Sequence, residues 1–187
     1  MNRVHRWLCR SSGWKKVLEE RILPSVVRDL DLGENVLEVG PGFGLTTDWL
    51  RQRLNQLTAV EIDHQLAYLL ASRMRGTNVR VIRGDGTALP FKEKSFSGAV
   101  AFTMLHHVAS VDLQDRLFAE MCRVVRSGGV FAGVDSTDSP LMRLLHICDT
   151  LVPVDPSTLT ARLTAAGFTK ISVNAEGRGF RFCAICP

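Results

Sequence analysis

Three glycines at alternate positions, Gly40, Gly42 and Gly44, follow a short apolar run at 36–39. A strand that turns tightly through glycines into a helix brings bare backbone N–H groups against a ligand. The dinucleotide fingerprint needs G-x-G-x-x-G, and Leu45 stands where its third glycine belongs. The spacing therefore indicates a ligand held by backbone at this turn, and it argues against a nicotinamide dinucleotide.

Two acidic residues follow later strand patterns. Glu61 ends the pattern at 57–62, about twenty residues past the glycines, where a carboxylate can accept hydrogen bonds from both hydroxyls of a ribose. Asp85 can accept from the exocyclic amine of an adenine, Gly86 keeps its loop slim, and Ile62 is placed to cover one face of the base. Either acid alone is more often a solvated loop residue. Their order along the chain favours a nucleoside site.

His106 and His107 follow the strand pattern at 99–102, which ends at Phe102. An imidazole titrates near neutral pH, so either histidine is a candidate general base. The common alternative is that both pack at the end of the sheet or cap the next helix. The catalytic role is therefore a hypothesis to test.

Strand and helix patterns alternate along the chain, which is typical of a parallel sheet with helices on both faces. The helix at 112–125 is expected to be capped by Asp112 and ended by 127–129. We expect one α/β domain over 1–187 that needs no linker. The predicted strands are 36–39, 57–62, 79–82, 99–102, 130–134, 169–174 and 180–186, and the predicted helices are 14–29, 46–54, 64–74, 112–125 and 157–166.

The motif Glu38-x-Gly40-x-Gly42-x-Gly44 resembles the first motif of the class I S-adenosylmethionine-dependent methyltransferases. The stretches 84–91, 104–108 and 120–129 resemble their later motifs in the right order. The likeness covers about 33–135, and it is closest to the small-molecule group that includes the ubiquinone and menaquinone methyltransferases.

The resemblance implies a Rossmann-like, doubly wound, seven-stranded and mostly parallel sheet with its last strand antiparallel. It also implies S-adenosylmethionine as methyl donor. Glu38, Gly40 and Gly42 are expected to contact the methionine part of the cofactor, in a glycine loop that also includes Gly44. Glu61 is expected to contact the ribose, and Ile62, Asp85 and Gly86 the adenine. The backbone of Phe102 is expected to lie near the sulfonium.

We expect three regions within the single domain: 1–30 as a helical segment that covers the site, 33–135 as the cofactor-binding core, and 139–187 as a lid-like helix, a last helix and two terminal strands. Leu141, Leu144 and Leu145 begin an apolar stripe at helical spacing that reads as a lid or, as we favour, as core. If 1–18 and 139–152 line the acceptor pocket, the methyl acceptor is a small apolar molecule, lipid- or quinone-like.

Composition sets further bounds. The 187 residues are 45% hydrophobic, and no run approaches the roughly 18 apolar residues of a membrane span. The start of the chain lacks the apolar stretch of a secretion signal, so we expect a cytoplasmic protein. Five cysteines make an odd count, and Cys183-x-x-Cys186 lies in an apolar strand pattern. We expect buried thiols there and no metal site.

The net charge of +4 is mild, but basic residues gather at the start of the chain. Arg3, Arg6 and Arg10 interleave with Val4 and Trp7, so a basic amphipathic helix with weak membrane-surface contact is one interpretation. A solvated basic face over the domain is the interpretation we favour. We expect no nucleic-acid partner.

Three rival functions remain. Ribosomal RNA adenine dimethyltransferases resemble this chain around the glycines, but they carry an Asn-Leu-Pro-Tyr type motif where 102–105 reads Phe-Thr-Met-Leu. A non-catalytic module that binds an adenosyl cofactor would also need only the glycine turn and the acids. A nicotinamide oxidoreductase is weakened by Leu45 and by the later motifs.

Overall fold

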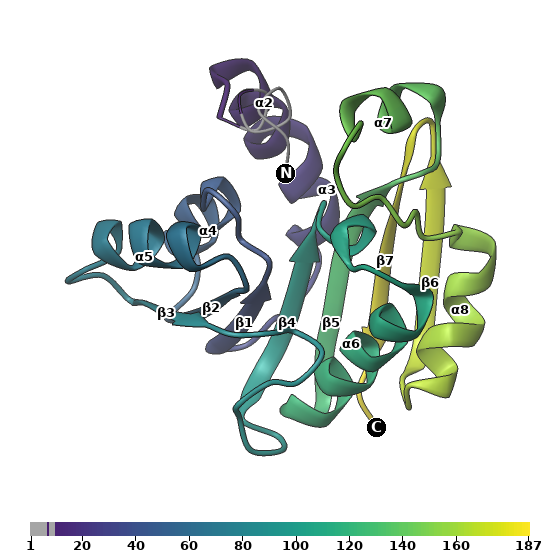
Figure 1. Ribbon diagram of the computed structural model, residues 1–187. Helices are drawn as coiled ribbons and strands as arrows, with labels where there is room; N and C mark the ends of the chain where they lie inside the picture. The colour runs from purple at the N-terminus through teal and green to yellow at the C-terminus, as the bar shows by residue number, and fades with distance from the viewer. Residues whose placement is uncertain (1–6, 8–9) are drawn as a thin grey trace.

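The computed structural model describes residue 7 and residues 10–187. These form one seven-stranded sheet in the order β3-β2-β1-β4-β5-β7-β6 (Figure 1). The pairs from β3 through β5 are parallel, and β7 is antiparallel to both of its neighbours. The predicted fold class is therefore confirmed. The strands are β1 (Asn35–Val39), β2 (Gln56–Glu61), β3 (Val79–Arg83), β4 (Phe96–Phe102), β5 (Val125–Ser136), β6 (Thr169–Glu176) and β7 (Gly179–Ile185).

Helices cover both faces of the sheet. On one face α6 and α8 pack against β1, β4 and β5, and the stacked rings of Phe131 and Phe168 lie in this core. On the other face α3 and α4 pack against the same strands, while Leu70 of α5 packs against β2. The helices are α2 (Ser12–Val17), η1 (Leu18–Ile22), α3 (Leu23–Val27), α4 (Leu45–Leu50), α5 (His64–Arg73), η2 (Leu105–His107), α6 (Val111–Val124), α7 (Pro140–Leu145) and α8 (Pro156–Ala165).

The first predicted helix, 14–29, is more varied than its pattern suggests. Its middle part, η1, is a π-helix in which the N–H of Leu23 bonds to the carbonyl of Leu18. Pro24 is the second residue of α3, two positions after the end of this wider turn. A proline lacks an N–H and clashes with the carbonyl four residues earlier, and a π-turn relieves both constraints without ending the helix. The basic residues expected before it, Arg3 and Arg6, lie outside the described residues.

Two boundaries of α6 differ from the prediction. Ser110, not Asp112, caps the helix, because the hydroxyl oxygen of Ser110 accepts the N–H of Leu113. The helix ends at Val124, before the glycine pair, and β5 begins at the next residue. The turn at 127–129 therefore lies within the span of β5, where Gly128 has a φ of +78°. The pairing of β4 with β5 shifts register at this point.

The structure also describes the apolar stripe that begins at Leu141 and the two cysteines near the end of the chain. Leu141 and Leu144 are exposed on α7, so the prediction that this stripe is core is wrong. Cys186 is buried and Cys183 half-buried, and the Sγ of Cys186 lies 3.8 Å from that of Cys122. Burial raises the pKa of the Cys186 thiol to about 12. Within the part of the chain that is described, no helix is long and apolar enough to cross a membrane.

Candidate active site

The glycine turn joins β1 to α4, and two of its glycines have distinct physical roles. Gly44 is the N-cap of α4 with a φ of +76°, and a Cβ there would lie 2.4 Å from the Nη2 of Arg73. Gly42 has a φ of +55°, and apart from its chain neighbours no heavy atom of the described residues lies within 4 Å of its Cβ position. The turn thus packs tightly against α5 at Gly44, and at Gly42 it leaves backbone open to a ligand.

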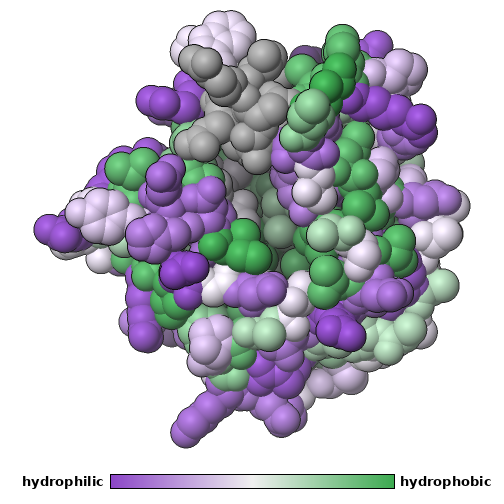
Figure 2. All heavy atoms as spheres, viewed as in Figure 1, coloured by the Kyte–Doolittle hydropathy of each residue, from purple (hydrophilic) through white to green (hydrophobic). Residues whose placement is uncertain are grey.

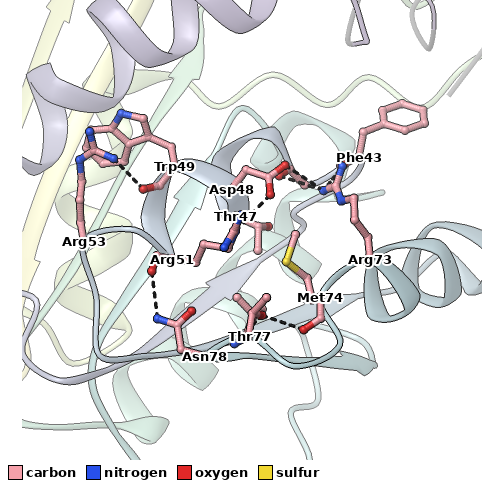
Figure 3. Close-up of polar contacts among 12 residues, drawn as sticks. Phe43, Thr47, Asp48, Trp49, Arg51, Arg53, Arg73, Met74, Thr77 and Asn78 are labelled. Atoms are coloured by element: carbon pink, nitrogen blue, oxygen red, sulfur yellow. Dashed lines mark hydrogen bonds and ion pairs between the residues drawn. The ribbon is translucent and has the colours of Figure 1, made fainter.

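Arg73 of α5 holds the turn from its outer side (Figure 3). Its guanidinium donates to the carbonyls of Phe43 and Gly44 at 3.0 and 3.2 Å. The same guanidinium pairs with the carboxylate of Asp48 on α4 at 3.2 Å. One side chain therefore joins α5 to the glycine turn and to the first turn of the following helix. Sequence reasoning missed it, because an arginine near a helix C-terminus usually marks a helix end.

Glu61 ends β2 beside this turn and is buried. Its Oε2 accepts the N–H of Gly42 at 2.9 Å, and its Oε1 accepts the N–H of Asp63 at the same distance. A carboxylate offers about four lone-pair sites, so each oxygen keeps capacity for one more donor. The arrangement fits the predicted contact with two ribose hydroxyls.

Glu38 has different surroundings from those its motif implies. Its carboxylate accepts the hydroxyls of Thr46 and Thr47 in the first turn of α4, the latter at 2.6 Å. The side chain is buried, and burial raises the pKa of Glu38 to about 7 against the opposing effect of these hydrogen bonds. In the described chain Glu38 joins β1 to α4, and its predicted contact with the methionine part stays a prediction.

The residues predicted for the adenine lie at the next two strand ends. Ile62 is 65% exposed, which is unusual for an isoleucine and leaves its side chain open to cover a flat ring. Asp85 is exposed, and its Oδ1 accepts the N–H and the hydroxyl of Thr87 at 2.8 Å. A Cβ on Gly86 would lie 2.8 Å from Val39, so this loop is slim because it packs directly against β1.

The end of β4 carries backbone in an unusual conformation. Phe102 is buried, and Thr103 follows it with a φ of +50°. The N–H of Thr103 bonds to the carbonyl of Val134, which holds this conformation in place. The side chain of Met104 then lies against Gly40, since a Cβ on that glycine would be 2.9 Å from its Cε. Such strained residues cluster at functional sites. No pattern in the sequence predicts the strained backbone of Thr103.

His106 and Asp135 form a buried pair behind this strand end. The Nδ1 of His106 lies 2.5 Å from the Oδ1 of Asp135, at the end of β5. The carboxylate also accepts the backbone N–H of His106 at 3.1 Å and that of Ser136 at 2.6 Å. The Nε2 of His106 is buried and has no hydrogen-bond partner among the described residues. The imidazole is thus fixed in one orientation with one nitrogen left for chemistry.

Two further imidazoles contact this pair. The ring centroids of His107 and His146 lie 4.2 and 5.0 Å from that of His106. His146 is the C-cap of α7, and its Nδ1 lies 2.7 Å from the carbonyl oxygen of Met142. Burial lowers the pKa of His146, with a smaller effect in the same direction from His106 and an opposing one from the Met142 carbonyl.

Comparison with known proteins places this chain in a family. Residues 37–133, just over half of the chain, match the model of a family described as a methyltransferase domain. The chain belongs to that family. The methyltransferase prediction is thereby confirmed, with S-adenosylmethionine as the cofactor of the domain.

The individual relatives differ in sequence identity and in the share of the chain that they cover. The ribosomal RNA small subunit methyltransferase A of Streptococcus pneumoniae is 37% identical to this methyltransferase over 79 residues, which are 41% of the chain. The chain matches 27% of the length of that relative. A solved protein of Pyrococcus horikoshii has a TM-score of 0.77 at 17% identity and covers 96% of the chain and 94% of its own. Phosphoethanolamine N-methyltransferase 2 of Haemonchus contortus, solved with S-adenosylmethionine, has a TM-score of 0.75 at 13% identity. The match covers 100% of this chain and 60% of that protein.

The residues of the methyltransferase fit its cofactor at the edge predicted for it. Gly42 leaves room beside bare backbone, Glu61 offers free acceptor capacity, and Ile62 is exposed. Two surface cavities of about 450 and 500 Å³ lie elsewhere, and none of the predicted site residues lines either one. The carboxyl ends of the strands are therefore the candidate site, as expected for an open parallel sheet.

Sequence reasoning missed two polar residues of this methyltransferase, Asp135 and His146. Asp135 follows the predicted strand 130–134, so the rule that found Glu61 at the end of another strand would have found it as well. His146 had no such signal, because its place depends on how the segment after β5 folds back over η2. The N–H of Val152 bonds to the carbonyl of His106 at 2.8 Å and fixes that return.

Proposed function

We propose that this methyltransferase transfers the methyl group of S-adenosylmethionine to a hydroxyl or an acidic carbon of a small apolar acceptor. The observation that carries the proposal is the imidazole of His106, which is buried at the end of β4 and oriented by Asp135. An acceptor of this kind must lose a proton. A neutral imidazole with a free nitrogen is the natural group to take it.

The protein's part in the reaction follows from this geometry. S-Adenosylmethionine, when bound, supplies a methyl group that a sulfonium already activates. The glycine turn and Glu61 position the donor, and closure around the acceptor excludes water. The proton that the acceptor loses would go to the Nε2 of His106. Asp135 stabilises the imidazolium that forms.

The apolar character of the acceptor rests on α7. Leu141, Leu144 and Ile147 are exposed, although large apolar side chains usually pack inside. Figure 2 shows hydrophobic side chains on the side of this face where α7 lies, next to a hollow near the centre of the view. A cluster of exposed apolar residues beside a reaction centre favours an apolar ligand. A lipid- or quinone-like acceptor is the class we propose.

The donor half of the proposal is tested by calorimetry with S-adenosylhomocysteine. Glu61→Ala removes a charged acceptor and is expected to weaken binding by about 1.5–3 kcal/mol, roughly 10- to 150-fold. Glu34→Ala changes an exposed glutamate just before β1; it is the matched control and should bind like the wild type. NAD should not bind. Equal loss in both variants would mean that Glu61 does not face the ribose.

The acceptor half is tested by methyl transfer to a panel of phenols, quinols and polar alcohols. We expect turnover with apolar members. His106→Ala should lower kcat by about 10²–10⁴ while leaving the binding of S-adenosylhomocysteine intact, as expected for loss of a general base. His107→Ala should change kcat far less. An unchanged rate and pH profile in His106→Ala would rule out His106 as the base.

Modification of RNA is the second candidate, because a curated relative of the chain is a ribosomal RNA methyltransferase. The segment after β4 lacks the Asn-Leu-Pro-Tyr type motif of the adenine dimethyltransferases. Strongly salt-dependent binding of ribosomal RNA, with transfer to it, would favour this candidate over the small acceptor. Tight cofactor binding without transfer to any acceptor would instead indicate a non-catalytic module.

A further inference from the structure

Three histidines gather at the candidate site, and the proposed methyl transfer uses one of them. His106 and His107 belong to η2, and His146 ends α7, forty residues later. Each offers a ring nitrogen, and the three ligand atoms all lie within 4.8 Å of one another. His107 is half-buried and the other two are buried. Imidazole is the commonest metal ligand in proteins, so the cluster is a candidate metal site.

In His106 and His146 the Nδ1 atom makes the hydrogen bond, so the Nε2 atom is the one that would face a metal. The Nδ1 of His106 faces the carboxylate of Asp135, and the Nδ1 of His146 faces the carbonyl oxygen of Met142. Because an acceptor at Nδ1 requires an N–H there, a neutral ring carries its lone pair on Nε2. Histidines that ligate metals almost always donate their other N–H to a carboxylate or a backbone carbonyl. Both rings therefore already have the hydrogen-bond partners that metal ligands have.

The buried lone pair of His106 is a second observation. Its Nε2 is enclosed, in a side chain that is 3% exposed, and it finds no hydrogen-bond partner among the described residues. Leaving a buried polar atom unpaired destabilises the folded state. A metal ion would satisfy it.

The segments that carry the cluster are fastened to one another. Gln114 of α6 is fully buried, and its amide donates to the carbonyls of Leu105 and Val152 at 3.1 and 2.8 Å. The N–H of Val152 in turn bonds to the carbonyl of His106. These bonds hold the turn after α7 against η2. They bring the segment that follows α7 to η2, beside the three rings.

The spacing fits a metal site after a small adjustment. With metal–nitrogen bonds of about 2.0–2.1 Å, tetrahedral ligands lie about 3.4 Å apart. The nitrogens of the cluster lie within 4.8 Å of one another, so small movements of the rings would have to close the difference. Three protein ligands leave a fourth position open, as in catalytic zinc sites.

We propose that His106, His107 and His146 bind a divalent transition-metal ion of the zinc type, with Asp135 as the positioning residue behind His106. The inference goes beyond the proposed methyl transfer and stands independently of it. An ion bound at the Nε2 of His106 occupies the lone pair that would take the acceptor's proton. Metal binding and proton transfer at this nitrogen therefore exclude each other.

The test uses the full chain, with Zn²⁺ and Co²⁺ alone as probes. Metal-free protein is titrated with Co²⁺ and followed by visible absorption, then Zn²⁺ is added to displace it and its affinity is measured by calorimetry. We expect one equivalent to bind with the absorption typical of a tetrahedral site. His107→Ala should weaken Zn²⁺ binding by about 100-fold or more, and Asp135→Asn by roughly 10- to 100-fold.

His64→Ala is the matched control, because His64 is exposed on α5, away from the cluster, and should bind Zn²⁺ like the wild type. Because buried variants can fail to fold, the imidazole resonances of the wild type are also followed by NMR. Shifts confined to the three clustered histidines would support the site. No metal binding by the wild type, or equal loss in His64→Ala and His107→Ala, would overturn it.

Methyl transfer is measured separately on the same samples, so that the two ideas fail in different ways. If Zn²⁺ binds and transfer stops, both the metal site and the proton role of His106 are supported. If Zn²⁺ binds through the cluster and transfer continues unchanged, the metal site stands and His106 is not the base.

Discussion

The Nδ1 of His106 lies 2.5 Å from the Oδ1 of Asp135, and both side chains are buried between the ends of β4 and β5. The two residues are 29 positions apart in the sequence, and the parallel pairing of β4 with β5 brings them to the same edge of the sheet. A carboxylate in this position fixes the ring tautomer and its direction. The pair therefore determines which nitrogen of His106 meets a ligand.

Replacement of Asp135 by asparagine should distinguish its effect on the His106 imidazole from any effect on cofactor binding. Asp135→Asn keeps the size of the side chain but loses the charge that stabilises an imidazolium. We expect kcat of methyl transfer to fall by roughly 10²-fold or more, within the range for general-base catalysis, while S-adenosylhomocysteine binds normally. The pH–rate profile should change as well. A normal profile with a lower rate would instead indicate that Asp135 only supports the fold.

The sequence could predict the fold because its signals are local. The strand patterns, the glycine turn and the alternation of strands with helices each depend on neighbouring residues. The number of strands and the antiparallel last strand came from a resemblance, and the structure confirms both. Boundaries were less predictable where local signals compete. Ser110 and Asp112 can both cap α6, and the serine does so in the structure.

The candidate site could be predicted only in part. Glu61, Ile62 and Asp85 follow strand ends, which a sequence shows directly. The surroundings of Glu38 could not be foreseen, because the bonds to its carboxylate depend on the angle at which α4 leaves the glycine turn. Its hydrogen bonds to Thr46 and Thr47 are consequences of that angle. His146 is a tertiary neighbour of His106, and no spacing rule relates the two.

Gly42 offers a test of the glycine turn with a matched control. Gly42→Ala and Gly76→Ala both place a Cβ at a positive φ, +55° and +75°, where no heavy atom of the described chain beyond the neighbours lies within 4 Å. Each should lose about 1–2 kcal/mol of stability to backbone strain. Gly42→Ala alone should weaken S-adenosylhomocysteine binding, by roughly tenfold or more.

Thermal unfolding and calorimetry of both variants check this expectation. The comparison is informative because both variants carry the same kind of backbone strain, whereas only Gly42 lies in the glycine turn. If the two variants bind S-adenosylhomocysteine equally well, the open side of Gly42 does not face the ligand.

Arg73 should support the turn from outside. Arg73→Ala removes two hydrogen bonds to the turn and the ion pair with Asp48. Because the side chain is 47% exposed, the loss is expected to be near 1 kcal/mol, or about fivefold in affinity for S-adenosylhomocysteine. Arg75→Ala, a nearby exposed arginine, is the control and should bind normally. Calorimetry decides the case, and an unchanged Arg73→Ala would show that the turn holds its shape without this clamp.

Glu38 should make stability depend on pH in an unusual direction. Burial raises its folded-state pKa from 4.5 to about 7, so folding favours the protonated form. The stabilising effect of that form is complete below about pH 4.5 and is lost as the pH rises to about 7. Since one pKa unit corresponds to about 1.4 kcal/mol, Glu38 should cost the folded state about 3 kcal/mol above pH 7.

Glu38→Gln removes the titration but can still hydrogen-bond to Thr46 and Thr47. Urea unfolding of the wild type and the variant at pH 5, 6, 7 and 8 gives the difference in the free energy of unfolding, in which other titrating groups cancel. The variant should gain on the wild type steadily between pH 5 and 7, and above pH 7 the difference should stay constant. A difference that does not change with pH would mean that Glu38 is already ionised at pH 5, and that the two threonine hydroxyls stabilise its charge more than burial penalises it.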